Sequence, residues 1–290
     1  MPTDPPTTLT LRDPLLTLPS RSRQARYSSA HYHPGVPELV PANDNDDGTG
    51  PQPPRPDWTA ATISSRPNGQ LATYHETRPT FTAFSRKTRR LVSEESFWER
   101  LYRVWWNLDP DIADFEMQGL EIEMVTEDGK ERTYTVDAVL AHGSRIEARE
   151  IKASGSHLLE SDTRQLMVNT GDILARAGIG FTPVTGNALL ENRRLLMNLS
   201  YGSIHKDDAV PADERDAVIR AITRGASRFA DIEPILGECP LIRKAKAFSL
   251  LASSALWFDL REELRQQSII RAPVAATAPD IRKIKKSFVR

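Results

Sequence analysis

The chain has 290 residues, 39% of them hydrophobic, and a formal net charge of −1. Its length allows two modest domains, and its near-neutral charge restricts nucleic-acid binding to local basic patches. The single cysteine, Cys239, excludes an internal disulfide framework and a cysteine zinc cluster. No apolar run approaches the ~20 residues that span a bilayer, and MPTDPPTTLTLRDP lacks the basic start of a signal peptide. We therefore expect a soluble cytoplasmic protein that does not bind membranes.

Residues 1–78 contain most of the prolines and polar clusters such as PANDNDDGTGPQPPRPDW. Their apolar residues follow no sustained period, so folding would bury too little apolar surface to offset the loss of chain entropy. We expect this region to be disordered. The alternative is a partner-binding arm, because RSRQARYSSAHYH combines basic residues with Tyr27 and Tyr32.

Residues 79–206 show the regular patterns of a folded domain. SEESFWERLYRVWWNLDP predicts a helix that begins at Ser93 or Ser96 and ends before Pro110. The next segments predict a three-stranded meander, then a helix, a strand and a helix. These elements span 114–125, 131–141, 145–153, 158–178, 180–184 and 188–199, with turns at EDGK and HGS. This order is typical of a mixed α/β domain.

Residues 207–275 are mainly helical, with candidate helices at 212–225, 226–237 and 239–254. Residues 255–271 could supply short strands. Three helices followed by a hairpin is the order of a small winged-helix domain. Residues 276–290 are predicted to be a loose basic tail.

The acidic and basic residues of the hairpin YTVDAVLAHGSRIEAREIKAS are the main candidates for chemistry. Glu150 and Lys152 are two residues apart on one strand, so they share a face, and the turn at HGS would bring Asp137 beside them. Neighbouring carboxylates favour a hard cation such as Mg²⁺ or Mn²⁺, which can activate water against a phosphodiester. The alternative is a solvated hairpin with cross-strand ion pairs, each contributing only ~0.2–1 kcal/mol.

Two further motifs accompany this hairpin. The segment from Ser85 to Arg90, SRKTRR, is similar to the S-x-K-T-G-R motif of TnsA-type endonucleases, with Arg89 in place of the glycine. ESFWE, which ends at Glu99, is similar to their E-S-x-L-E helix start. The chain therefore resembles the TnsA-type endonuclease subunit of heteromeric transposases, within the PD-(D/E)xK nuclease superfamily, over residues 84–154 and more loosely to 198. The spacing from Glu99 to Gln118 also resembles that family.

The resemblance implies a restriction-endonuclease-like mixed sheet flanked by helices. It also implies that Glu99, Asp137 and Glu150 hold Mg²⁺ or Mn²⁺ and that Lys152 is the catalytic lysine. From the residues alone Glu95, one turn before Glu99, is an equal choice for the helix carboxylate. The family commonly reads T-P-D-F around its central aspartate, whereas this chain reads TVDA, which predicts different packing beneath Asp137.

Two basic clusters are candidates for DNA contact. Such residues would position a phosphate backbone without reading sequence, and the second cluster lies where a winged helix carries its recognition helix. The first cluster comprises Arg86, Lys87, Arg89 and Arg90, and the second comprises Arg243, Lys244 and Lys246.

The resemblance implies an endonuclease subunit of a transposition system. It would cut double-stranded DNA at transposon ends, on the strand that a partner DDE-class transposase leaves intact, with an ATPase regulator nearby. One alternative is a stand-alone phage or restriction-type nuclease. Another is a catalytically silent scaffold that bridges DNA and a partner, and a third is a regulatory protein that binds DNA through its C-terminal helices.

Overall fold

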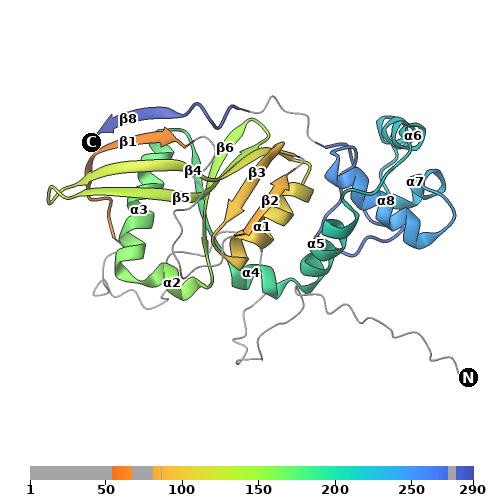
Figure 1. The fold of residues 1–290 in the computed structure, drawn as a ribbon, viewed down its shortest axis with the longest axis horizontal. Helices are drawn as coiled ribbons and strands as arrows, with labels where there is room; N and C mark the ends of the chain where they lie inside the picture. The colour runs from red at the N-terminus through yellow and green to blue at the C-terminus, as the bar shows by residue number, and fades with distance from the viewer. Residues whose placement is uncertain (1–53, 67–80, 86, 274–278) are drawn as a thin grey trace, which may run out of the picture. The chain divides into compact units, whose positions relative to one another are not determined.

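The computed structural model describes residues 54–66, 81–85, 87–273 and 279–290. They all belong to one compact unit, Pro34–Arg290, whose main sheet has six strands in the order β7-β6-β5-β4-β1-β8 (Figure 1). Only the β6–β7 pair is parallel. The strands are β1 (Trp58–Ser65), β4 (Ile112–Thr126), β5 (Glu131–His142), β6 (Arg145–Lys152), β7 (Gly180–Thr185) and β8 (Lys285–Val289). The predicted mixed α/β class is confirmed.

The predicted three-stranded meander is also confirmed. β4 pairs with β5 and β5 pairs with β6, both antiparallel. The two connections turn at Gly129 (φ 78°) and Gly143 (φ 59°), which adopt left-handed backbone conformations that glycine tolerates without strain. The EDGK and HGS motifs therefore mark these turns correctly.

Helices cover both faces of the meander. Ala138 and Leu140 of β5 belong to a hydrophobic cluster that includes residues of α1 (Phe97–Leu108). Val139 and Ala141 belong to a second cluster that includes residues of α3 (Ser161–Arg176). Alternate side chains of a strand point to opposite faces, so residues 138–141 of β5 lie between these two layers.

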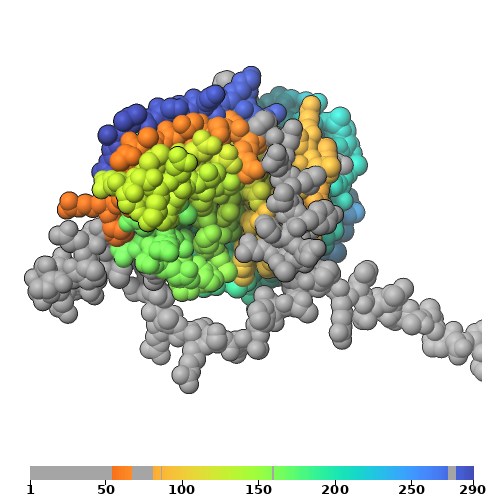
Figure 2. All heavy atoms as spheres, turned by 60° about the vertical axis from the view of Figure 1, so that its left-hand side comes forward, coloured from red at the N-terminus to blue at the C-terminus, as the bar shows by residue number. Residues whose placement is uncertain are grey.

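Two strands of the sheet lie in regions expected to lack structure. The expectation of disorder in residues 1–78 was wrong for Trp58–Ser65, and the expectation of a loose tail was wrong for Lys285–Val289. β1 lies between β4 and β8, and Figure 2 shows the C-terminal residues in blue along the orange β1. The rest of the predicted N-terminal region, except residues 54–57 and 66, lies outside the described residues, including Tyr27 and Tyr32.

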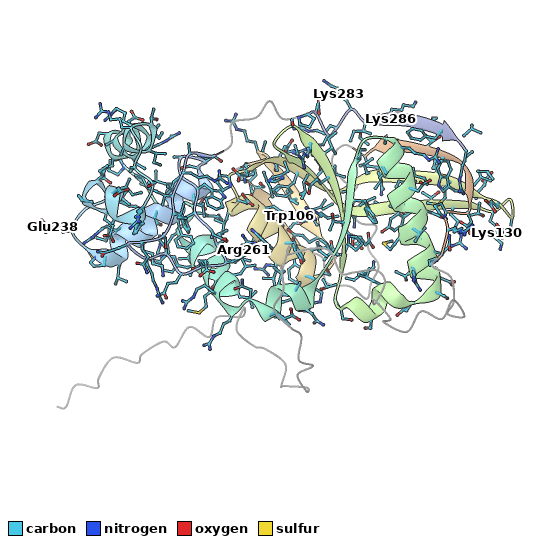
Figure 3. The ribbon with its side chains drawn as sticks, turned by 180° about the vertical axis from the view of Figure 1, so that it is seen from behind. Trp106, Lys130, Glu238, Arg261, Lys283 and Lys286 are labelled. Carbon is cyan, nitrogen blue, oxygen red and sulfur yellow. The ribbon has the colours of Figure 1, made fainter. Side chains whose placement is uncertain are left out.

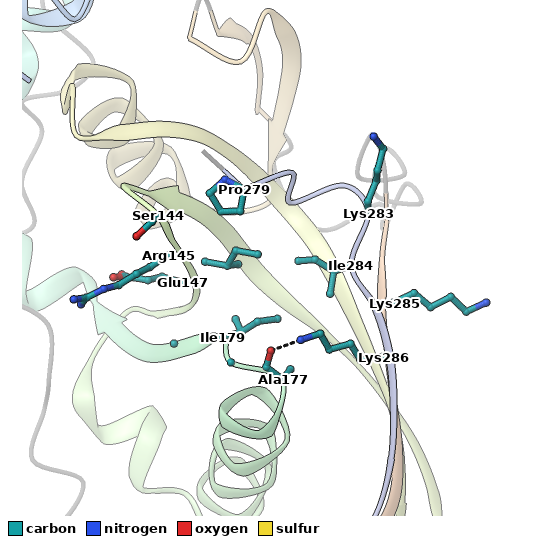
Figure 4. A pocket seen from close by; sticks show the side chains of 13 residues that line it. Ser144, Arg145, Glu147, Ala177, Ile179, Pro279, Lys283, Ile284, Lys285 and Lys286 are labelled. Atoms are coloured by element: carbon teal, nitrogen blue, oxygen red, sulfur yellow. Dashed lines mark hydrogen bonds between the residues drawn. The ribbon is translucent and has the colours of Figure 1, made fainter. Parts of the chain in front are cut away.

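The segment around β8 also contacts α3. Lys286 donates a hydrogen bond to the carbonyl of Ala177, at the C-terminal end of α3 (Figure 4). Lys283 and Lys285 point away from that contact. A lysine at the end of a helix stabilises carbonyls that have no partner within the helix, so the C-terminal strand helps to hold α3 on the sheet.

The helix α1 begins at the second of the two predicted N-caps. Ser96 is the N-cap, and its hydroxyl accepts a hydrogen bond from the Glu99 amide at 3.2 Å. Ser93 is not the cap because it lies in β3 (Arg90–Glu94), which forms a separate hairpin with β2 (Phe81–Ser85).

Both of the other predicted helices of this region are divided: the segment predicted as one helix at 158–178 falls on two helices, at 155–159 and 161–176, with Glu160 between them. The predicted helix at 188–199 is two helices, because Asn192 interrupts it and caps the second by accepting from the Leu195 amide at 2.8 Å. The helices are α2 (Gly155–Leu159), α4 (Gly186–Glu191) and α5 (Arg193–His205).

The C-terminal part contains the three predicted helical segments. They are α6 (Ala212–Thr223), α7 (Phe229–Ile232) with the 3₁₀ turn η1 (Glu233–Ile235), and α8 (Pro240–Ala252). Residues 255–271 contribute two isolated antiparallel bridges, Arg228↔Ile269 and Trp257↔Arg271, in place of the predicted strands.

One hydrophobic core joins the C-terminal helices to α1. A Cβ atom placed on Gly202 of α5 would lie 2.6 Å from Leu108 and 2.9 Å from Phe248, so the glycine permits close packing of three helices. Trp106, labelled in Figure 3, packs against Phe115 of β4 with ring centroids 6.0 Å apart. In the described part of the chain, no helix is long and apolar enough to cross a membrane.

We predict that Trp58→Ala lowers the free energy of unfolding by about 3–5 kcal/mol, the usual cost of truncating a buried tryptophan. Trp58 is fully buried, and its indole nitrogen donates to Asp172 at 3.0 Å. Val289→Ala is the control, because that side chain is 85% exposed and should change stability by less than about 0.5 kcal/mol. Chemical denaturation measures both. Equal stability of the two variants would contradict the inclusion of β1 in the folded core.

Candidate active site

The candidate site lies where the β5–β6 ladder ends. The last paired residues of the ladder are Ala138 and Arg149. Immediately beyond them, the Asp137 carboxylate accepts a hydrogen bond from the Ile151 amide at 2.7 Å. A side-chain oxygen thus takes the place of a main-chain acceptor, and this contact fixes Asp137 beside the Glu150–Lys152 segment of β6.

A β-bulge on β4 lies opposite Asp137. Met117 pairs with Ala138 and Leu120 pairs with Val136, so Gln118 and Gly119 together oppose the single residue Asp137. Gln118 has φ 51°, in the left-handed region that non-glycine residues rarely adopt. Bulges bend a strand and redirect nearby side chains, and they are common beside active sites. The bulge therefore interrupts the regular β4–β5 register at the position of Asp137.

The carboxylate of Glu150 is almost completely enclosed. Its side chain is 1% exposed, and each of its oxygens has a protein partner. Tyr134 donates its hydroxyl proton to Oε2, and the Lys152 ammonium forms an ion pair with Oε1. Ile151, between them in sequence, points into the core with α1, as predicted.

Glu99 reaches the same cluster from the first turn of α1. It is 7% exposed, and it accepts hydrogen bonds from the Glu95 amide at 3.0 Å and the Ser96 hydroxyl at 2.8 Å. Burial raises its pKa, and the nearby charges of Glu95 and Glu150 add to this effect. Of the two helix carboxylates considered, Glu99 is thus the one that interacts with Glu150, and it also caps its own helix.

Electrostatic interactions connect the four predicted catalytic residues. Burial raises the pKa of Asp137 well above its ordinary value, and the charge of Glu150 raises it further, whereas Lys152 opposes the shift. Burial lowers the pKa of Lys152, but the carboxylates of Glu150, Asp137 and Glu99 outweigh burial, and the pKa is raised. Lys152 therefore remains charged and partly neutralises the three carboxylates.

A divalent cation needs several oxygen ligands that surround one point. Among the described residues, no three His, Cys, Asp or Glu side chains form a group that could hold a metal ion. A cage of Glu99, Asp137 and Glu150 is therefore not formed in this conformation. By the chemistry of their side chains, Asp137 and Glu150 are the type of ligand that Mg²⁺ takes, because Mg²⁺ is commonly held by one or two carboxylates together with water and substrate phosphates.

Sequence reasoning missed Tyr134 as part of the site. Burial raises its pKa, as do the charges of Glu150 and Asp137, so the hydroxyl keeps the proton that it donates to Glu150. Its position three residues before Asp137 on β5 did not indicate a role in the site, because a tyrosine in a strand is most often a core residue. The bulge could have been suspected from the Gln118-Gly119 pair inside a strand pattern.

The residues of the first predicted DNA-contact cluster lie in different surroundings. Lys87 donates to the carbonyls of Trp106 and Asp109 at the C-terminal end of α1, so DNA contact by Lys87 stays a prediction that would require its ammonium to leave these carbonyls. Burial lowers the pKa of Lys87 to about 8, against the opposing charges of Asp109 and Asp111.

The arginines of the same cluster differ from Lys87. Arg90 pairs with Asp114 at 2.8 Å and with Glu116, which leaves it little freedom to bind a phosphate. Arg89 is exposed and has φ 54°. Arg86 lies outside the described residues.

The second predicted DNA-contact cluster, on α8, is paired within the protein. Arg243 lies 3.4 Å from Glu233, and Lys246 forms an ion pair with Glu214. The Lys244 ammonium lies 4.9 Å from the centre of the Tyr201 ring. DNA contact by these residues stays a prediction, and it would require them to exchange these partners for phosphates.

Comparison with known proteins gives no assignment. No family model matches the chain, and no curated protein matches it at a significant level.

The lowered pKa of Lys87 predicts a pH dependence of stability. The Lys87 ammonium has a pKa of about 8 in the folded state and 10.5 in the unfolded state. As pH rises, the folded protein therefore loses this proton at a lower pH than the unfolded chain does. Stability therefore increases with pH between these values. We expect Lys87→Met to lose this increase in denaturation measured at pH 8 and pH 10. Lys130→Met, whose side chain is 68% exposed, is the control and should follow wild type; identical slopes for all three proteins would refute the burial of the Lys87 ammonium.

The bulge predicts a second effect. A Cβ atom on Gly119 would lie 2.6 Å from the Cβ of Glu116, so Gly119→Ala must shift the β4 backbone opposite Asp137. We expect a loss of stability of about 1–3 kcal/mol and a change in the amide resonance of Ile151 observed by NMR. Gln118→Gly allows the same positive φ without strain and adds no atom that could clash, so it should leave that resonance nearly unchanged. If both variants left it unchanged, the bulge would have no influence on Asp137.

Proposed function

We propose that this protein is a metal-dependent DNA endonuclease. The observation that carries the proposal is the arrangement at the end of the β5–β6 ladder. Asp137 is fixed by the Ile151 amide, and Glu150 and Lys152 form an ion pair on the adjacent strand. Glu99 completes a cluster of three acids and one base. Buried carboxylates close together are costly to the fold, and the raised pKa values of Asp137 and Glu99 are typical of functional sites.

Each residue of this cluster would have a distinct chemical role. Asp137 and Glu150 would hold the cation, which supplies charge stabilisation for the phosphate and an activated water. Lys152 is 31% exposed, so its ammonium can reach a phosphate oxygen while its stem stays in the site. Its positive charge would oppose the negative charge that develops on the scissile phosphate. Glu99 adds negative charge beside Asp137 from the other side of the site.

The transposition context of the proposal rests on the resemblance to TnsA-type endonucleases. One structural feature supports it. Arg89 stands at the family's glycine position and has φ 54°, a conformation that glycine adopts most readily. On this basis the substrate is double-stranded DNA at transposon ends, and the partners are a DDE-class transposase and an ATPase regulator.

We also propose that residues 207–275 form a winged-helix-like module. The order of the three helices α6, α7 and α8, followed by the segment 255–271, supports this hypothesis. So do the bridges Arg228↔Ile269 and Trp257↔Arg271, because they align three extended segments side by side. The internal pairing of the α8 basic residues favours a role in packing or partner binding over direct reading of DNA.

A catalytically silent scaffold is the second candidate function. The observation that favours it is the saturation of the carboxylates by protein donors. Glu99 accepts from Ser96 and the Glu95 amide, and Glu150 accepts from Tyr134 and Lys152. A scaffold would retain this network without ever binding a cation.

Strand-mapped cleavage separates the two candidates. The substrate is a plasmid that carries transposon ends, incubated with Mg²⁺, the proposed DDE-class transposase partner and the proposed ATPase regulator. We expect wild type to cut the strand that the transposase leaves intact. Asp137→Asn and Glu150→Gln keep the side-chain shape and should reduce the rate on the order of 100-fold or more, as for loss of a transition-state electrostatic contact.

Glu123→Gln is the matched control, because Glu123 is an exposed carboxylate on β4. It should cut at the wild-type rate. Full cleavage by the Asp137 and Glu150 variants would eliminate the nuclease proposal in favour of the scaffold. Wild-type cleavage without the transposase, at sites unrelated to the ends, would instead indicate a stand-alone nuclease.

A further inference from the structure

Tyr134 is a neutral side chain of β5 that holds a carboxylate of the candidate site from within the sheet. Its ring packs against the hydrophobic cluster between the sheet and α3, and its hydroxyl donates to Glu150. A tyrosine ring has few rotatable bonds, so packing of the ring fixes the position of its hydroxyl. This hydroxyl is therefore a fixed donor aimed at one oxygen of Glu150.

The other partner of Glu150 is less restrictive. Lys152 has a long flexible stem that carries three donor hydrogens, and its side chain is partly exposed at 31%. An ammonium of this kind can follow the carboxylate through several orientations. Lys152 thus neutralises Glu150, whereas Tyr134 restricts the direction in which its carboxylate points.

Asp137 and Glu99 have separate anchors. Asp137 accepts from the Ile151 amide, and Glu99 accepts from the start of its own helix. Neither contact involves Tyr134. Loss of the Tyr134 hydroxyl would therefore act on Glu150 alone, which makes a specific test possible.

We infer that Tyr134 is a positioning residue that orients Glu150 for a divalent cation. This inference rests on the proposed function, because it assumes that Glu150 is a ligand. Hydrogen-bond partners of metal ligands commonly contribute 10–100-fold to metal affinity. Without the hydroxyl, Glu150 rotates about Lys152 and must be reordered when the cation binds. Tyr134→Phe, which keeps the ring, should therefore weaken Mn²⁺ binding roughly 10-fold.

The test measures Mn²⁺ binding to the full chain by electron paramagnetic resonance and calorimetry. The proteins are wild type, Tyr134→Phe, Glu150→Gln and the double variant. If Tyr134 acts through Glu150, the double variant binds Mn²⁺ as weakly as Glu150→Gln alone, because the effects of coupled residues are not additive. A purely structural role would give additive losses. Thermal unfolding of each protein confirms that the variants compared are folded.

Tyr102→Phe is the matched control. Tyr102 is also a buried tyrosine, but its hydroxyl donates to the main-chain carbonyl of Thr185 at 2.9 Å. We expect wild-type Mn²⁺ affinity for this variant. If Tyr134→Phe and Tyr102→Phe both bound like wild type while Glu150→Gln did not, the role of Tyr134 would be refuted and the metal site would stand. If Glu150→Gln also bound like wild type, or wild type bound no Mn²⁺, the proposed function would fail and this inference with it.

Discussion

The hydrogen bond from the Ile151 amide to the Asp137 carboxylate is the contact on which the candidate site depends. It forms where the β5–β6 ladder stops at Ala138 and Arg149, and the β4 bulge lies opposite the same residue. Had the ladder continued through Asp137, a main-chain carbonyl would accept from Ile151 and the carboxylate would have no fixed position. A local interruption of the regular sheet thus places an acidic group where β-sheet geometry alone would not.

The elements that local patterns specify were predictable from the sequence. The 3.6-residue period of α1, the glycine turns at Gly129 and Gly143, and the alternation in β6 each act within a few residues, and all three are present. The pairing of Glu150 with Lys152 follows from the same two-residue period and is observed. Because these patterns are local, the residue types and spacings of the site could be predicted from the sequence.

The parts that escaped prediction depend on contacts between distant segments. β1 is a short strand within a proline-rich region, and β8 is rich in lysine, which natural proteins place on edge strands to prevent aggregation. β1 pairs with both β4 and β8, and β8 pairs with β1 across more than 200 residues of chain, as in the pairing of Ile63 with Lys286. Two contacts were not predicted for a similar reason: the Tyr134 hydroxyl meets Glu150 on the adjacent strand, and the Lys87 ammonium meets a carbonyl at the end of a helix.

Glu99 shows how one residue can serve both the fold and the proposed site. As a capping residue it stabilises α1, and such caps contribute about 0.5–2 kcal/mol. To become a direct ligand it would have to leave Ser96 and the Glu95 amide and lose that contribution. Asp137 and Glu150 make no hydrogen bonds to the first turn of α1 that they would have to give up, and two carboxylates suffice for Mg²⁺. On the proposed function, Glu99 therefore acts first through its charge, and its coordination of a cation would be coupled to loosening of the first turn of α1.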